Sequence, residues 1–237
     1  MKFLDLPPVS RINSFLDHVD VGDYVVYGDL EAYSCKLAGL DKKLSKSLDV
    51  EVQAGSSPLE LSASPLGPLA DSSSRKTLIY LILTLNHIYP DYDFSQLRAN
   101  HFLKEDGLAK AEENIDSYLL EVSKVWSKTP GLCENPFLES LWTSIDEVIC
   151  LRECDLYCYK SDLETDPFGE KASIWSFNYF FYNKKMKRIL YFSCRAVSKK
   201  SLDEETTETS SKLYNYNSDS EADDDTAKYG MANTMDV

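Results

Sequence analysis

Only nine of the 237 residues are glycine, and they do not group into a loop that could hold a phosphate. The three histidines, His18, His87 and His101, stand far apart in the sequence. The chain also contains no G-x-S-x-G, H-E-x-x-H or Walker-type pattern, which would mark a hydrolase, a zinc protease or a nucleotide site. We therefore expect a protein that is not an enzyme and that needs no cofactor.

Basic residues are also scarce, since 25 lysines and arginines face 39 acidic side chains and give a formal charge of −14. A chain of this charge is repelled by nucleic acid and attracted to basic protein surfaces, so we expect no direct nucleic-acid binding. The longest apolar run, Leu78 to Leu85, is far shorter than the ~20 residues that span a bilayer. The first residues do not form the apolar stretch of a secretory signal. We expect an intracellular protein without membrane contact.

The cysteines lie in or beside hydrophobic segments. They are Cys35, Cys133, Cys150, Cys154, Cys158 and Cys194. In an intracellular protein such cysteines behave as reduced, small apolar residues. Three of them form a C-x3-C-x3-C pattern, whereas zinc and iron–sulfur sites typically use C-x2-C pairs. We interpret this pattern as core packing and expect no metal.

Residues 173–197 predict a β-hairpin, because apolar residues alternate on both sides of a polar turn. One face of the first strand would carry Trp175, Phe177, Tyr179 and Phe181, and the other Asn178, Phe180 and Tyr182. A sheet that is apolar on both faces must be covered twice. The turn carries four cations as candidate partner contacts, Lys184, Lys185, Lys187 and Arg188.

The other expected elements follow from periodicity. A β-rich segment runs from 24 to 37, with Gly28 marking a bulge or tight turn. Apolar spacing predicts helices over 10–19, from 74 to the residue before Pro90, over 108–126 and over 136–150, and a strand over 154–159. The helix that begins at 74 is apolar nearly all round, which indicates a central position.

Two segments are expected to lie outside the folded core. Residues 49–74 are rich in serine and proline and contain no aromatic residue, so we predict a mobile linker. Residues 199–237 predict a disordered acidic tail that includes Glu221, Asp223, Asp224 and Asp225. The folded parts are then 1–48 and 75–198. The predicted fold class is α/β of the α+β type, a single domain with about five mostly antiparallel strands packed against helices.

Arg75 and Lys76 stand in the first turn of a predicted helix, where the helix dipole disfavours cations. They are either a solvated helix start or, with free backbone N–H groups, an anion site for a phosphate or a partner carboxylate. Asp91 and Asp93 follow Pro90, and we favour a turn stabilised by their side chains over a pair for acid–base chemistry.

Several serines lie in patterns that kinases accept. The candidates are Ser45, Ser57, Ser64, Ser218 and Ser220. Ser45 follows two lysines, Ser57 and Ser64 precede prolines, and the last two stand before acidic residues. Their place in the predicted mobile segments favours regulation, because kinases act on accessible chain and added charge changes docking.

Five stretches together resemble a known family. They are LEAYSCKLAG (30–39), SRKTLIYLILTLN (74–86), PDYDFS (90–95), IDEVICLRECDLYCYKSDLETDPFGE (145–170) and WSFNYFFYNKKMKRI (175–189). They are similar to the three sequence boxes of the Maf-type global repressors of RNA polymerase III, which are unrelated to the leucine-zipper Maf factors. The resemblance covers most of residues 1–48 and 74–197.

The resemblance implies a protein that is not an enzyme and that binds the clamp region of RNA polymerase III and the Brf-type subunit of its initiation factor. It implies that this binding blocks the association of the two. It further implies regulation by kinases and phosphatases through the linker, and movement between cytoplasm and nucleus with phosphorylation state.

Two other functions stay open at this point. The first is a phosphoregulated adaptor that acts on another assembly. The second is a carboxylate-dependent hydrolase that uses Asp91, Asp93 and Asp155. Capture of a different assembly would indicate the first, and a metal-dependent rise in melting temperature the second.

Overall fold

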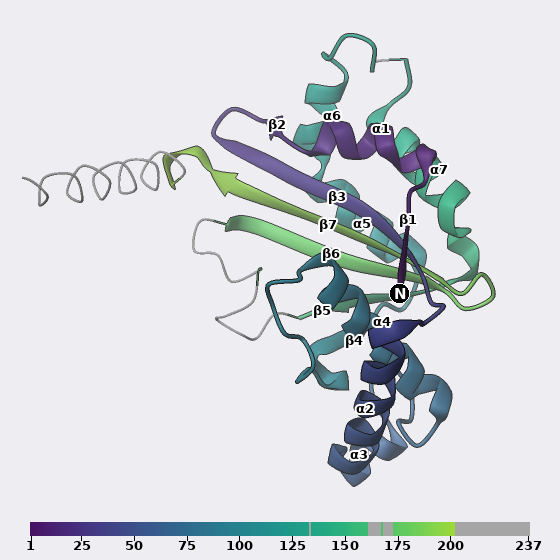
Figure 1. The fold of residues 1–237 in the computed structure, drawn as a ribbon. Helices are drawn as coiled ribbons and strands as arrows, with labels where there is room; N and C mark the ends of the chain where they lie inside the picture. The colour runs from purple at the N-terminus through teal and green to yellow at the C-terminus, as the bar shows by residue number, and fades with distance from the viewer. Residues whose placement is uncertain (133, 161–166, 168–172, 202–237) are drawn as a thin grey trace, which may run out of the picture. The chain divides into compact units, whose positions relative to one another are not determined.

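The computed structural model describes residues 1–132, 134–160, 167 and 173–201. Within them, seven strands form one sheet in which all neighbouring strands are antiparallel (Figure 1). The strands are β1 (Lys2–Leu4), β2 (Val19–Asp20), β3 (Tyr24–Ser34), β4 (Phe102–Lys104), β5 (Cys154–Tyr159), β6 (Ser173–Asn183) and β7 (Arg188–Ser198). Their order is β1-β3-β7-β6-β5-β4, with β2 paired to β3.

Helices cover both faces of this sheet. Their bounds are α1 (Pro7–Leu16), α2 (Gly39–Gly55), α3 (Pro58–Ser62), α4 (Ser72–Ile88), α5 (Leu108–Tyr118), α6 (Leu120–Trp126) and α7 (Phe137–Ile149). One core lies between the sheet and α1, α5, α6 and α7, and a second core lies between the opposite face and α2 and α4. The expected fold class is confirmed, and helices pack on both faces as expected, although α2 and α4 cover only part of the second face.

The central hairpin, β6 and β7, has the predicted faces. Phe177, Tyr179 and Phe181 belong to the first core, whereas Phe180 and Tyr182 belong to the second. The sequence locates the four longer strands, β3, β5, β6 and β7, but not β1, β2 and β4, which contain only two or three residues each. Alternation cannot be recognised over so few positions.

The helix expected over 108–126 is broken in two at Leu119. The backbone there leaves the helical region (φ −95°, ψ 7°), and the side chain is fully buried in the first core. The first helix begins earlier than expected, at Pro7 and Pro8, which suit the first helical turn because its N–H groups need no partner within the helix. In the described residues, we find no helix that is both long and apolar enough to cross a bilayer.

The sequence predicted no helix within residues 49–74, but the structure has helical segments there. Residues 49–55 continue α2, the short α3 follows, and α4 begins at Ser72. Val52, Leu66 and Leu69 are buried in the second core. The segment contains no aromatic residue, but these aliphatic side chains bury enough apolar surface to join it to the core. Mobility of this segment in solution stays a prediction.

Gly28 does not mark a bulge. The pairing of β3 with β7 runs without a shift from Tyr24 opposite Ser198 to Ser34 opposite Arg188. A Cβ atom at position 28 would overlap the Sγ atom of Cys194 and lie 3.3 Å from a Leu16 methyl carbon. Glycine is therefore required here by close packing across the first core.

Two asparagine side chains replace a missing strand partner. Asn13 of α1 donates to the Leu30 carbonyl (2.9 Å) and accepts from the Leu30 N–H (3.0 Å) at the outer edge of β3. Asn178 makes the same pair of bonds with the backbone of Tyr159, at 2.7 and 3.1 Å. These amides satisfy backbone groups that would otherwise stay unpaired at a strand end or edge.

We expect Asn13→Ala to lower the free energy of unfolding by about 1–2 kcal/mol, because both hydrogen bonds to Leu30 are lost at a half-buried position. The measurement is urea unfolding followed by tryptophan fluorescence. Ser14→Ala is the matched control, since its exposed hydroxyl bonds only within α1. Equal midpoints for the two variants would show that the amide pair contributes nothing.

Candidate interaction surfaces

The four cations of the hairpin turn are less available than the sequence indicated. Lys184 lies 2.8 Å from Asp155, and Lys185 lies 2.9 Å from Glu153. Arg188 donates to the Val148 carbonyl at the end of α7. Lys187, which is exposed, forms no ion pair with any residue in the described part of the chain.

Asp155 is the acidic centre of this turn. Lys104 also reaches it, at 2.9 Å. Burial opposes ionisation of this carboxyl group, but the hydrogen bonds from Lys184 and Lys104 outweigh burial and hold its pKa below the usual value. The turn is therefore a network of opposite charges in which, among the described residues, Lys187 is the lysine without an ion pair, rather than a cationic cluster.

Arg75 does not form the anion site proposed for the start of α4. Its side chain is buried, its Nε donates to Asp49 of α2 at 2.8 Å, and one terminal nitrogen donates to the carbonyls of Leu69 and Ala70, both at 2.8 Å. Arg75 thereby links α4 to α2 and to the segment that precedes α4. Lys76 is exposed and stays a candidate contact.

Asp91 and Asp93 lie in the turn after α4 and are exposed. Asp93 accepts a hydrogen bond from the Ser95 N–H at 2.9 Å, which is the turn-stabilising role that we favoured. The described residues contain no group of three or more histidine, cysteine or acidic side chains that could hold a metal ion. The hydrolase hypothesis, which needs Asp91, Asp93 and Asp155 together, receives no support from this arrangement.

The described cysteines are free thiols. Burial raises the pKa of Cys35 and of Cys154 to about 12, and burial near Glu105 raises that of Cys158 to about 11. A thiol with such a pKa is protonated at neutral pH and is a poor metal ligand or nucleophile. This agrees with the interpretation of these cysteines as apolar residues.

The described phosphorylation candidates have structural roles. Ser57 caps α3 and exchanges hydrogen bonds with Glu60. Ser64 is half-buried and donates to the Gly67 carbonyl at 2.5 Å. Ser45 is half-buried on α2. Ser218 and Ser220, like the acidic residues 221 and 223–225, lie outside the described residues.

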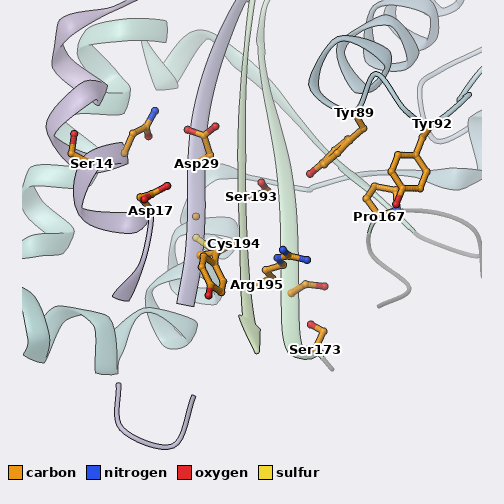
Figure 2. A pocket seen from close by; sticks show the side chains of 14 residues that line it. Ser14, Asp17, Asp29, Tyr89, Tyr92, Pro167, Ser173, Ser193, Cys194 and Arg195 are labelled. Carbon is orange, nitrogen blue, oxygen red and sulfur yellow. The ribbon is translucent and has the colours of Figure 1, made fainter. Parts of the chain in front are cut away.

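A hollow of about 860 Å³ on the described surface was not anticipated from the sequence. It lies where β3, β7 and β6 extend beyond the helices, and segments from both sides line it (Figure 2). Its lining residues are Asn13, Ser14, Asp17, Tyr27, Gly28, Asp29, Tyr89, Tyr92, Pro167, Ser173, Ser176, Ser193, Cys194 and Arg195. We call the sheet part of this hollow, residues Tyr27, Asp29, Ser176, Ser193 and Arg195, the open sheet face.

Two carboxyl groups on β3 dominate the electrostatics beside this face. Asp29 and Glu31 point to the same side of the strand and share a hydrogen bond. Glu31 also accepts a hydrogen bond from the hydroxyl group of Tyr33. Burial, together with the charge of Asp29, raises the pKa of Glu31 to about 7 despite the bond from Tyr33. Burial likewise raises the pKa of Asp29.

Comparison with known proteins gives consistent results. A family model described as Maf1 regulator matches residues 26–193. A Dictyostelium discoideum protein named repressor of RNA polymerase III transcription is 34% identical over 249 residues, covering 84% of this chain and 86% of that protein. A Schizosaccharomyces pombe protein named repressor of RNA polymerase III transcription maf1 is 36% identical and covers 84% of both chains. A crystal structure of citrus MAF1 matches with a TM-score of 0.67 at 45% identity, covering 81% of this chain and 99% of that chain.

These matches include the segments that carried the sequence resemblance. The family match extends from β3 through α4 to the hairpin of β6 and β7, which are the segments that build both cores. The resemblance stated from the sequence is therefore confirmed. The chain belongs to the Maf1 regulator family, in which the named relatives are repressors of RNA polymerase III transcription.

Proposed function

We propose that this protein represses transcription by RNA polymerase III, by binding the clamp region of the polymerase and the Brf-type subunit of its initiation factor so that the two do not associate. One observation carries the proposal: relatives named as repressors align with 84% of the chain, at 34% and 36% identity. Regulatory binding also suits the described chemistry, because burial keeps the thiols of Cys35 and Cys154 protonated at neutral pH and the described acidic groups form no metal site.

The electrostatic character of the chain supports a protein partner with a basic surface. The formal charge of −14 favours association with a nucleic-acid-handling machine over association with DNA itself. Exposed Lys76 and Lys187 are the described cations that stay candidates for contact with acidic parts of that partner.

Transcription of a transfer-RNA template by purified polymerase III and its factors tests this function. Added protein should reduce transcript yield in a saturable manner, and should do so less effectively when the initiation factor and polymerase are assembled on the template first. Transcript yield that is independent of the added protein in both orders would contradict the proposal.

Phosphorylation between α2 and α4 would act through the hydrogen bonds described above. A phosphate on Ser64 would remove the donation to the Gly67 carbonyl, and a phosphate on Ser57 would face the carboxylate of Glu60. We propose that these changes weaken repression and keep the protein in the cytoplasm, and that dephosphorylation favours nuclear entry. Glutamate replacements at Ser45, Ser57 and Ser64, with alanine replacements as controls, test this in the transcription assay and by imaging of cells.

The acidic tail is expected to act by charge. Residues 199–237 contain ten acidic and four basic side chains. Deleting the segment should change affinity for the polymerase at low salt and have little effect at high salt, because screening weakens interactions between exposed charges. Titrations at two salt concentrations measure this difference. An affinity that is unchanged at both would remove the tail from the mechanism.

A further inference from the structure

Among the described residues, no helix lies over one end of the sheet face that packs against α2 and α4 (Figure 1). β3, β6 and β7 are eleven residues long, and α2 and α4 cover only the end that carries Tyr33, Tyr182 and Ile189 (Figure 1). The other end is the open sheet face. The segment after α4 borders it with Tyr89 and Tyr92, and the end of α1 borders it with Asp17, which gives the hollow its depth (Figure 2).

The groups around this hollow suit a cationic side chain. Asp29 lies on its floor, and Asp17 stands at its rim. The ring of Tyr27 makes a cation–π contact with Arg195, whose Cζ lies 5.7 Å from the ring centroid. Carboxylates beside tyrosine rings bind lysine and arginine by ion pairing together with contact to the ring face.

The hollow also reaches the edge of β3 at Gly28. The backbone of Leu30 points outward to Asn13, and Val26 pairs outward with Val19 of β2. Alternation in an antiparallel strand directs the N–H and C=O of Gly28 to the same edge, between these two positions. A short extended segment could add one backbone pairing here, as peptides do at strand edges.

We propose that the open sheet face and the adjoining edge at Gly28 dock an extended segment of a partner protein that carries arginine or lysine. The cation would lie between Asp29 and Asp17, beside the ring of Tyr27. Charge complementarity selects this occupant over the acidic tail of the chain itself, which the carboxylates of the hollow would repel. The inference depends on this surface alone and not on the identity of the polymerase partner.

Proton release should accompany docking. A cation pairs with ionised carboxyl groups. Glu31 has a pKa of about 7 and is therefore mostly protonated below pH 7, so it must lose its proton before it can contribute a negative charge. Affinity should therefore fall from pH 8 to pH 6, because protonation of Glu31 removes negative charge from the carboxyl pair that contains Asp29. The titratable and charged groups that face the pair or its neighbours are Asp17, His18, Tyr33, His87, Tyr89, Tyr191 and Arg195. A His18→Gln variant checks that the carboxyl pair is the source.

The test uses the full chain and an acetylated, amidated peptide of sequence Gly-Ser-Arg-Ser-Lys-Ser-Gly, titrated by NMR. Shift changes should concentrate at Tyr27, Asp29 and Ser193. Asp29→Asn/Glu31→Gln should weaken binding at least about tenfold. Glu139→Gln/Glu147→Gln removes the same charge from the exposed side of α7 and should leave the affinity unchanged.

Each outcome of this titration decides the inference. Localised shifts, selective loss in the first double variant and a pH dependence that persists in His18→Gln support it. Equal affinities of the two double variants, or shifts spread over the acidic residues of the chain, overturn it. If the first double variant is poorly folded, the map of NMR shift changes in the unsubstituted protein still decides the inference. The outcome of this titration does not affect the transcription assay, which tests the proposed function separately.

Discussion

Replacing Arg75 by alanine should lower the free energy of unfolding by about 2–4 kcal/mol, the largest effect that we expect from a single substitution. The guanidinium bonds to Asp49 and to the carbonyls of Leu69 and Ala70, and it is only 8% exposed. Its removal would leave two partly buried carbonyls without a donor and release the segment before α4. Urea unfolding with circular dichroism detection gives the value.

Lys76→Ala is the matched control for this prediction, because the exposed neighbour contributes a charge at the same helix start without these bonds. We expect its unfolding free energy to change by no more than about 0.5 kcal/mol. A stable Arg75→Ala protein that had lost its response to phosphate would reverse the assignment and restore the anion site predicted from the sequence.

Gly28→Ala should destabilise the protein by about 2–3 kcal/mol, because the added methyl group overlaps Cys194 and crowds Leu16 and the Ser193 carbonyl. The second substitution Cys194→Ala removes the overlapping sulfur atom. The double variant should therefore be about 1 kcal/mol more stable than the sum of the two single effects predicts. Strictly additive unfolding energies would show that the two side chains do not collide.

The central hairpin could be predicted because each of its strands shows alternation long enough to be recognised. Trp175 to Phe181 assigned one face, and Phe180 with Tyr182 assigned the other, and both assignments hold in the structure. The helical segments within residues 49–74 were not predicted, for the opposite reason. Their composition was weighed without the helical spacing of Leu44, Leu48 and Val52, which places α2 against the second core.

The open sheet face could not be predicted, because its parts come from distant positions of the chain. Asp29, Tyr89 and Arg195 meet only through the pairing of β3 with β7 and the turn after α4. Arg75 was misassigned in a similar way, since its partners on α2 and before α4 become neighbours only after folding. A local sequence pattern gives the charge of a residue but not the groups that will neutralise it.

The stability of the fold and the proposed mode of action are connected through β3. This strand pairs with β7 along its whole length, borders the open sheet face and packs Gly28 against Cys194. Substitutions in β3 that alter repression must therefore be checked for unfolding first. Asp29→Asn/Glu31→Gln suits this purpose because it keeps the size of both side chains.

Competitive binding to purified RNA polymerase III tests the central claim most directly. The polymerase is immobilised, saturated with the full chain, and then exposed to the Brf-containing initiation factor. The account predicts saturable binding of the chain at micromolar concentration or below, and loss of initiation-factor binding in proportion to occupancy. Undetectable binding at that concentration, or a factor that binds the occupied polymerase with unchanged affinity, would contradict it.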